Sequence, residues 1–295
     1  MTTIVNKDEK FFPYATELKE ERVTKSDVAS FQPLYSPDGK EIAFLENRTA
    51  IRIINLDSKK VRTAMEGKYQ YSYSDGDQWY QWSPDSKWIL SNSITVGGWN
   101  NQDVVLVDAS GNGVMHNLTQ SGYSDGHAKW VLDGKAMIWS SDRAGYRSHG
   151  SWGAEDDIYI MFFDGERYAE FKKDKEDRAI AEMLKDDKEK DKEEKKEKKD
   201  SVKAEKKGER LVLDLENRKD RIVRLTRLSG RLGDYHLTKD GKKLYYSMRL
   251  ERSTDLCLLN LEDNSIKVVA KGVSGSIYPT EDDKYMYMLS GGSVS

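Results

Sequence analysis

The fold is decided by a short polar phrase, Ser36-Pro37-Asp38-Gly39-Lys40, which is followed at once by an apolar segment. Proline presets the backbone for the first central position of a tight turn. The aspartate side chain can accept hydrogen bonds from nearby amides, and glycine tolerates a left-handed backbone. A turn of this kind predicts a link between two adjacent antiparallel strands.

Similar turns recur four more times along the chain. They are centred on Asp85, Asp133, Asp240 and Asp282, so the intervals between successive aspartates are 47, 48, 107 and 42 residues. Intervals of 42 to 48 residues match one blade of a β-propeller. The interval of 107 residues matches one blade plus about 60 inserted residues.

The same order of strands follows each turn. The first strand after a turn is predicted at 41–45, 88–93, 136–140 and 243–248, and the next at 51–56, 103–107, 157–162 and 255–260. A last strand closes the unit, for example at 61–65 or 266–270. We therefore predict an all-β chain, a β-propeller of four-stranded antiparallel blades with about five repeats, in a ring whose completeness stays open. A helical solenoid is the rival, but the segments are short, β-branched and aromatic, with Gly and Asp turns between them.

A run of charged residues interrupts the repeats. Residues 172–207 hold 15 basic and 13 acidic side chains among 36 positions. Their alternating signs favour a helix in the first half, whereas the second half has nothing to bury. The sequence predicts a lead-in or the end of a preceding blade at 1–30, blades at 31–171, a charged helical or disordered insertion at 172–208, and blades at 209–295. Strands are expected to resume at 211–215 and 222–225.

Composition excludes several classes of protein. The net charge of -3 with 34% charged residues is nearly balanced, which argues against a nucleic-acid partner, because phosphate contacts call for a basic face. No apolar run approaches the roughly 18 residues of a membrane span. The single cysteine, Cys257, lies in an apolar strand and is expected to be a buried structural thiol.

No catalytic, metal or cofactor site is predicted. The phrase Gly122-Tyr123-Ser124-Asp125-Gly126 matches a nucleophile elbow, which needs a strand before the serine and a helix after it. Here the next residues lead into a blade turn, and Tyr73-Ser74-Asp75-Gly76 repeats the phrase one blade earlier, so loop architecture is the better interpretation. The histidines lie in different repeats without ligand spacing, and phosphate- and dinucleotide-binding glycine motifs are missing.

One loop does resemble a functional one. Between Ser141 and Asp157, an inter-strand loop carries Arg147, His149 and Trp152 among glycines. We predict these three residues as candidates for contacts with a peptide along a substrate path, with packing against the neighbouring blade or the inserted helix as the alternative. Trp79, Trp82 and Trp130 are expected in the core between blades.

Several long phrases carry a family resemblance. The turns look like those of TolB- and tricorn-type propellers. Residues 69–85, 117–126, 147–153 and 214–221 resemble, more narrowly, the propeller region of bacterial tricorn-like peptidases. That family implies a serine peptidase of the tail-specific protease superfamily, with PDZ-like and catalytic domains after the propeller. Its catalytic serine and histidine have no counterpart in this chain, so no catalytic residue is carried over.

The resemblance implies a function and an address. We expect a non-catalytic propeller that filters or channels peptide substrates towards a catalytic core absent from this chain. The partners would be peptides and the PDZ-like and catalytic domains of the parent protein, with a homo-oligomer left open. The relatives imply a periplasmic or cell-envelope location, with the cytoplasm as the alternative. A stand-alone TolB-like protein-binding module is the main alternative function, and the propeller of a prolyl-oligopeptidase-like enzyme is a third.

Overall fold

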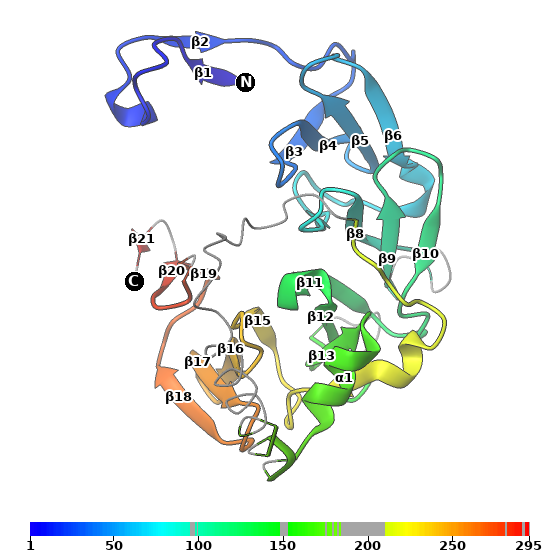
Figure 1. Ribbon diagram of the computed structural model, residues 1–295, viewed down its shortest axis with the longest axis vertical. Helices are drawn as coiled ribbons and strands as arrows, with labels where there is room; N and C mark the ends of the chain where they lie inside the picture. Colours follow the sequence, from blue (N-terminus) through cyan, green and yellow to red (C-terminus); the bar gives the residue numbers. More distant parts are fainter. Residues whose placement is uncertain are drawn as a thin grey trace, which may run out of the picture.

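The chain is built from antiparallel sheets that follow one another in sequence. A computed structural model of the 295 residues describes residues 1–94, 98, 100–147, 153–174, 176–178, 180–181, 183, 210–280, 282–290 and 293–294. Figure 1 shows the sheets placed one after another around an arc, with β3, β11 and β15 on its concave side and β6 and β18 on its outside. The predicted β-propeller architecture is therefore confirmed.

Four sheets are complete four-stranded meanders, called blades I to IV. Blade I contains β3 (Ser30–Tyr35), β4 (Glu41–Glu46), β5 (Ala50–Asn55) and β6 (Val61–Met65). Blade II contains β7 (Tyr80–Trp82), β8 (Trp88–Ser93), β9 (Asp103–Asp108) and β10 (Met115–Asn117). Blade III contains β11 (Asp125–Val131), β12 (Ala136–Ser141), β13 (Asp157–Phe162) and β14 (Ile222–Arg224). Blade IV contains β15 (Leu232–Leu237), β16 (Lys243–Leu250), β17 (Ser253–Asn260) and β18 (Ile266–Ala270).

The remaining elements are short. Blade V contains the described strands β19 (Ser276–Pro279), β20 (Met286–Ser290) and β21 (Ser293–Val294), and a separate two-stranded sheet pairs β1 (Thr2–Ile4) with β2 (Leu18–Glu20). The described helices are α1 (Gly165–Lys172) and the 3-10 turns η1 (Phe12–Tyr14), η2 (Gly67–Tyr69), η3 (Leu132–Gly134) and η5 (Arg218–Arg221). Among the described residues, no helix has the length and apolar character needed to cross a bilayer.

All five aspartate turns link the first two strands of a blade. In four of them, a Ser or Thr hydroxyl two residues before the aspartate ties the turn together. In blade IV, for example, Thr238 Oγ1 accepts from the N–H of Lys243 at 3.1 Å, and Asp240 Oδ1 accepts from the N–H of Lys242 at 2.9 Å. Each hydroxyl thus donates to the aspartate and accepts from the backbone, which satisfies polar groups that a tight turn leaves unpaired.

The turn of blade III is built differently. Val131 stands where the other turns have a hydroxyl. The chain instead forms η3, with Leu132 at φ 53° and Asp133 at φ 55°. Both residues are in the left-handed region, which is uncommon for side chains other than Asn, Asp and Gly. The blade spacing is therefore kept even though this turn has the backbone hydrogen bond from Lys135 N–H to the Leu132 carbonyl at 3.0 Å in place of the side-chain hydrogen bonds of the other turns.

The first strands of successive blades are joined by side-chain hydrogen bonds. Trp82 Nε1 donates to the carbonyl of Leu34 in blade I at 3.1 Å. Tyr235 Oη donates to the carbonyl of His127 in blade III at 2.6 Å. Trp79 Nε1 donates from the end of the preceding link to the carbonyl of Ala128 at 2.9 Å. The prediction of a core position between blades is confirmed for Trp82, which is buried in the cluster of blades I and II, and for Trp130, which packs against the cluster of blades II and III. Trp79 contacts blade III through its hydrogen bond but belongs to no buried cluster of the described residues.

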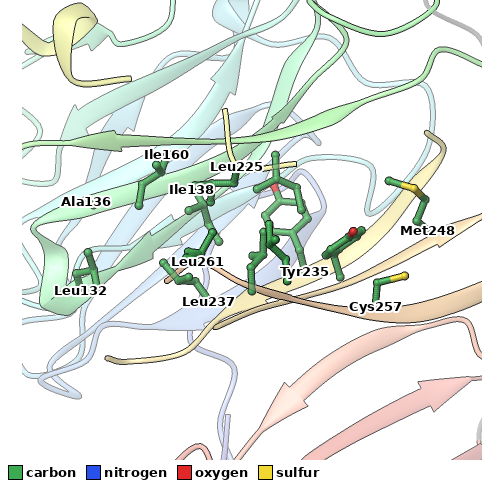
Figure 2. Close-up of a cluster of buried hydrophobic side chains, with 14 of the residues drawn as sticks. Leu132, Ala136, Ile138, Ile160, Leu225, Tyr235, Leu237, Met248, Cys257 and Leu261 are labelled. Carbon is green, nitrogen blue, oxygen red and sulfur yellow. The ribbon is translucent and has the colours of Figure 1, made fainter. Parts of the chain in front are cut away.

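The hydrophobic core lies between blades. Figure 2 shows Ala136, Ile138 and Ile160 of blade III near Tyr235 and Leu237 of blade IV, and all five belong to one buried cluster. Cys257 belongs to the same cluster and is 2% exposed, as the sequence predicted. Each blade thus completes its core only against a neighbour, which is the packing logic of a repeat protein.

The insertion leaves blade III between β13 and β14. Helix α1 begins before the predicted insertion and packs Phe171 against Phe162, with ring centroids 5.1 Å apart. Further helical residues occur at 176–178, 180–181 and 183, and positions from Asp187 to 209 lie outside the described residues. The chain returns through residues 210–221, here called the return segment.

One strand prediction is wrong. Residues 211–215 form no strand, although Leu213 and Leu215 pack against the cluster between blades II and III. The reason is that β13 is already flanked by β12 and β14, so this segment cannot pair with β13. It makes single backbone contacts, such as Leu211 N–H to Asp85 Oδ2 at 2.6 Å.

Candidate functional site

The connections between strands lie at two opposite ends of the propeller. Because neighbouring strands are antiparallel, the aspartate turns share one end, here called the turn face. The links between blades and the loops between the second and third strands share the other end, here called the loop face. Its described parts at blades II and III are residues 66–79, 98, 100–102, 118–124, 142–147 and 153–156. The predicted candidate Arg147 lies on the loop face.

Residues 66–79 form a loop that is held by one carboxylate. Asp77 Oδ2 accepts from the N–H groups of Tyr73 at 2.6 Å and Ser74 at 3.0 Å, and Oδ1 accepts from the hydroxyl of Ser72 at 2.8 Å. Partial burial would raise the pKa of Asp77, but these hydrogen bonds lower it below its ordinary value. The carboxylate therefore stays charged and the loop keeps its shape at neutral pH.

This loop presents aromatic rings to solvent. Tyr71 is 45% and Tyr73 is 64% exposed. Their rings meet edge to face with centroids 4.9 Å apart. The segment also contains Ser72, Ser74 and Gly76, and a mixture of Tyr, Ser and Gly is typical of protein-binding loops. A stiff loop with exposed tyrosines can bind a partner at a low cost in conformational entropy.

The Arg147 side chain contacts residues of three different connections on the loop face. Its Nε donates to Asp142 Oδ2 at 3.0 Å, its guanidinium stacks 5.3 Å from the ring centroid of Tyr123, and Nη2 donates to Asn101. Tyr123 remains 39% exposed and Tyr146, next to Arg147, is 66% exposed. The other two predicted candidates, His149 and Trp152, lie outside the described residues.

Buried aspartates lie under these loops. Asp125, Asp142 and Asp157 have fully buried side chains, and each pairs with an arginine that comes from a loop or an edge strand. Arg143 holds both oxygens of Asp125, at 2.9 and 3.1 Å. A buried carboxylate is costly without such a partner, so these ion pairs fix where the arginines lie.

Sequence reasoning missed these aspartates. A signal was present, because Asp103 and Asp157 each begin the third strand of a blade, and Thr119 and Thr226 each follow the fourth. In the structure the Thr226 hydroxyl donates to Asp157 at 2.7 Å and the Thr119 hydroxyl to Asp103 at 3.2 Å. The repeated pairing closes two blades in the same way.

Asp156 differs from its neighbours. Burial, together with the nearby charges of Asp142 and Asp157, raises the pKa of Asp156 to about 6. Within the described part of the chain, no ion pair to its carboxylate is found. Its backbone is fixed, since its N–H donates to the carbonyl of Gly230 at 2.7 Å. This carboxyl group therefore titrates closer to neutral pH than an ordinary aspartate, whose pKa is 3.8.

A second set of polar side chains lies below the loop face, on the first strands of blades III and IV. Lys129 Nζ of blade III donates to Asp234 Oδ1 of blade IV at 2.5 Å and lies 5.0 Å from the ring centroid of Tyr235. The His127 ring lies 5.6 Å from that of Trp79. Loss of hydration disfavours the charged imidazole and lowers the pKa of His127, and the charge of Lys129 lowers it further. These side chains give the concave wall a polar surface next to aromatic rings.

The structure offers no nucleophile elbow at Ser124. The residue ends a link and is followed by strand β11 instead of a helix, and its N–H donates to Asp142 Oδ1 at 2.9 Å. His236 pairs with Asp283 of blade V at 2.9 Å. Across the residues that the structure covers, no three His, Cys, Asp or Glu side chains gather as a metal site would require.

Solved structures match the chain in fold. TolB from Acinetobacter baumannii is 17% identical with a TM-score of 0.52, and the match covers 94% of this chain and 52% of that one. The tricorn protease is 13% identical with a TM-score of 0.57, covering 92% of this chain and 25% of that one. The fold is that of a TolB- and tricorn-type β-propeller.

These matches establish the architecture alone. No protein-family model and no curated protein matches the chain. The chain spans about half of the TolB chain (52%) and a quarter of the tricorn protease (25%), and identities of 13 and 17% leave the activity undetermined. What the protein does has to be argued from its own loop face.

Proposed function

We propose that this chain is the non-catalytic propeller portion of a tricorn-like serine peptidase, and that its loop face binds peptide substrates and guides them to a catalytic core elsewhere. Four exposed tyrosines on the loop face, over loops held by internal hydrogen bonds, carry this proposal. Tyr71, Tyr73, Tyr123 and Tyr146 belong to this set, each between 39 and 66% exposed.

Peptide recognition fits the chemistry of this face. Tyrosine offers a large apolar area and a hydroxyl while losing few rotamers on binding, so it serves as an anchor for many sequences. The Asp77 loop and the Arg147 contacts hold the tyrosines in place before a partner arrives. A surface that binds peptides of many sequences needs a fixed scaffold and side chains that do not select for one sequence.

A binding measurement tests the proposal. We expect the chain to bind labelled unstructured peptides, detected by fluorescence anisotropy. Replacing Tyr71 and Tyr73 together by serine should weaken binding at least about tenfold, which is about 1.4 kcal/mol. Tyr285→Ser is the matched control, because Tyr285 is 67% exposed but follows the aspartate turn of blade V on the turn face. Equal affinities for the wild type and the loop-face variant would refute the proposal.

A stand-alone TolB-like module is the second candidate. It is supported because TolB and the tricorn protease match this chain with similar TM-scores, 0.52 and 0.57. Such a module would bind a folded protein on the loop face and would need no peptidase. Affinity for one folded partner without affinity for unstructured peptides would favour it.

The gene sequence downstream of Ser295 distinguishes between these candidate parent proteins. A PDZ-like segment followed by a serine-bearing core would support the peptidase, whereas a stop codon would support the module. A hydrolase elbow would support a prolyl-oligopeptidase-like parent. For either of the first two we propose a periplasmic or cell-envelope location, which fractionation of cells that express the whole gene would test.

A further inference from the structure

A cavity lies on the turn face, away from the loop face. Its volume is about 130 Å³, and its wall includes residues from the α1 region, from the turn of blade IV, and from the end of β17. It is here called the arm-root cavity, because the charged insertion leaves the propeller at this point. A dry cavity of about 150 Å³ in another protein holds benzene, so this one can take a compact apolar group.

The floor of the arm-root cavity is apolar. Leu132 is 8%, Phe162 0% and Leu261 9% exposed, and all three belong to the core cluster between blades III and IV. Phe171 of α1 closes one side against Phe162. A ligand that covers this floor with hydrocarbon would remove the remaining water contacts of Leu132 and Leu261.

The charges around the cavity do not balance. Among the described residues of its wall, three are acids and four are cations. Arg167 pairs with Glu170 at 2.6 Å, and Lys242 pairs with Glu262 at 2.9 Å. The remaining two cations are Lys173 and Arg178.

The third acid of the wall, Asp240, already accepts hydrogen bonds within its own turn. Partial burial would raise the pKa of Asp240, but hydrogen bonds from the hydroxyl of Thr238 and the N–H of Lys242 lower it, so the carboxylate is ionised inside its turn.

Arg178 donates through Nη2 to the carbonyl of Phe171 at 3.1 Å. No ion pair of Lys173 or Arg178 with a carboxylate occurs within the described ranges. Two cations thus border an apolar floor.

We propose that the arm-root cavity binds a carboxylate carried on a compact apolar group. The apolar group lies on Leu132, Phe162 and Leu261, and the carboxylate pairs with Lys173 and Arg178. The C-terminal residue of a polypeptide and a free short-chain acid share this chemistry. The bound ligand bridges the root of the insertion to blade IV, so it couples the position of the insertion to occupancy. This site does not depend on peptide binding at the loop face.

Calorimetric titration of the whole chain tests the proposal and distinguishes the two sources. The probes are 4-methylpentanoate, and an acetylated tripeptide ending in leucine with either a free or an amidated C-terminus. Binding of the free-acid tripeptide but neither its amide nor 4-methylpentanoate identifies a polypeptide C-terminus. Binding of 4-methylpentanoate identifies a free acid. Inorganic phosphate should not bind, because it has no group for the floor.

Variants locate the site. Lys173→Gln with Arg178→Gln should weaken binding tenfold or more, and Ala181→Leu should abolish it by filling the cavity from a helical position of the wall. Lys172→Gln is the matched control, since Lys172 lies over the ring of Tyr168 at 6.0 Å and outside the cavity wall. Binding should also slow hydrogen exchange at residues 165–174. Failure of every probe to bind at concentrations up to about 5 mM, or binding that survives in both variants, would overturn the proposal.

Discussion

Replacing Asp156 by asparagine is expected to stabilise the protein at neutral pH. The carboxyl group has a pKa of about 6 because it is partly buried and lies near the charges of Asp142 and Asp157. Asparagine has the same shape and carries no charge, so it removes the cost of ionising this site. The backbone bonds between Asp156 and Gly230 do not involve the side chain and should persist.

The size of the effect follows from the two pKa values. The gap between the ordinary 3.8 and about 6 in the folded protein corresponds to about 3 kcal/mol. Asp156 keeps part of its surface in water, which screens the charge, so we expect a gain of about 1 to 2 kcal/mol. Because the folded pKa is raised, the penalty is fully present above about pH 6 and disappears as the pH falls through the unfolded value near 4.

Urea denaturation at several pH values measures this gain. The advantage of Asp156→Asn over the wild type should be largest at pH 7.5, fall to about half at pH 5, and vanish near pH 4. Asp27→Asn, which changes an exposed carboxylate, is the control and should leave stability unchanged. An Asp156→Asn protein that is less stable than the wild type at pH 7.5, or a gain that does not depend on pH, would refute the reasoning.

Three further predictions concern the blades. Thr238→Val removes the hydroxyl that holds the turn of blade IV and should cost about 1 to 2 kcal/mol in urea denaturation; an unchanged midpoint would contradict this. Lys129→Met leaves the carboxylate of Asp234 without its cation and should lower the free energy of unfolding by about 2 to 3 kcal/mol. Adding Asp234→Asn should restore part of this loss in a double-mutant cycle, whereas additive losses would contradict an interaction between the two side chains. The pKa values of Asp38 and Asp77 are lowered by hydrogen bonds that outweigh burial, so their stabilisation exists above about pH 4 and is lost as the pH falls further, which thermal melts from pH 5 to pH 2.5 should detect as a falling Tm.

The turns and strands could be predicted from the sequence because their signals are local. Residues such as Asp38 and Asp240 act through amides a few positions away, and alternating apolar residues mark the strands that follow. Even so, Val131 shows the limit of the local signal. The turn of blade III keeps its place without the hydroxyl, because strand pairing between β11 and β12 fixes it.

The loop face was only partly predictable. Arg147 was identified from the composition of its loop, but its partners Asn101 and Tyr123 come from other connections. The sequence does not reveal such contacts, because they depend on how blades II and III pack. The strand expected at 211–215 was wrong for the same reason, since local apolar alternation does not show that the edge of β13 is already occupied.

Site-specific cross-linking tests the binding role of the loop face most directly. A photoreactive amino acid at Tyr73 or Tyr146 on the loop face is compared with one at Tyr35 or Tyr285 near the turn face, all four being at least 55% exposed. With a labelled unstructured peptide, we predict adducts at the first two positions and none at the last two. Equal cross-linking at all four positions, or adducts confined to the turn face, would contradict a peptide-binding loop face.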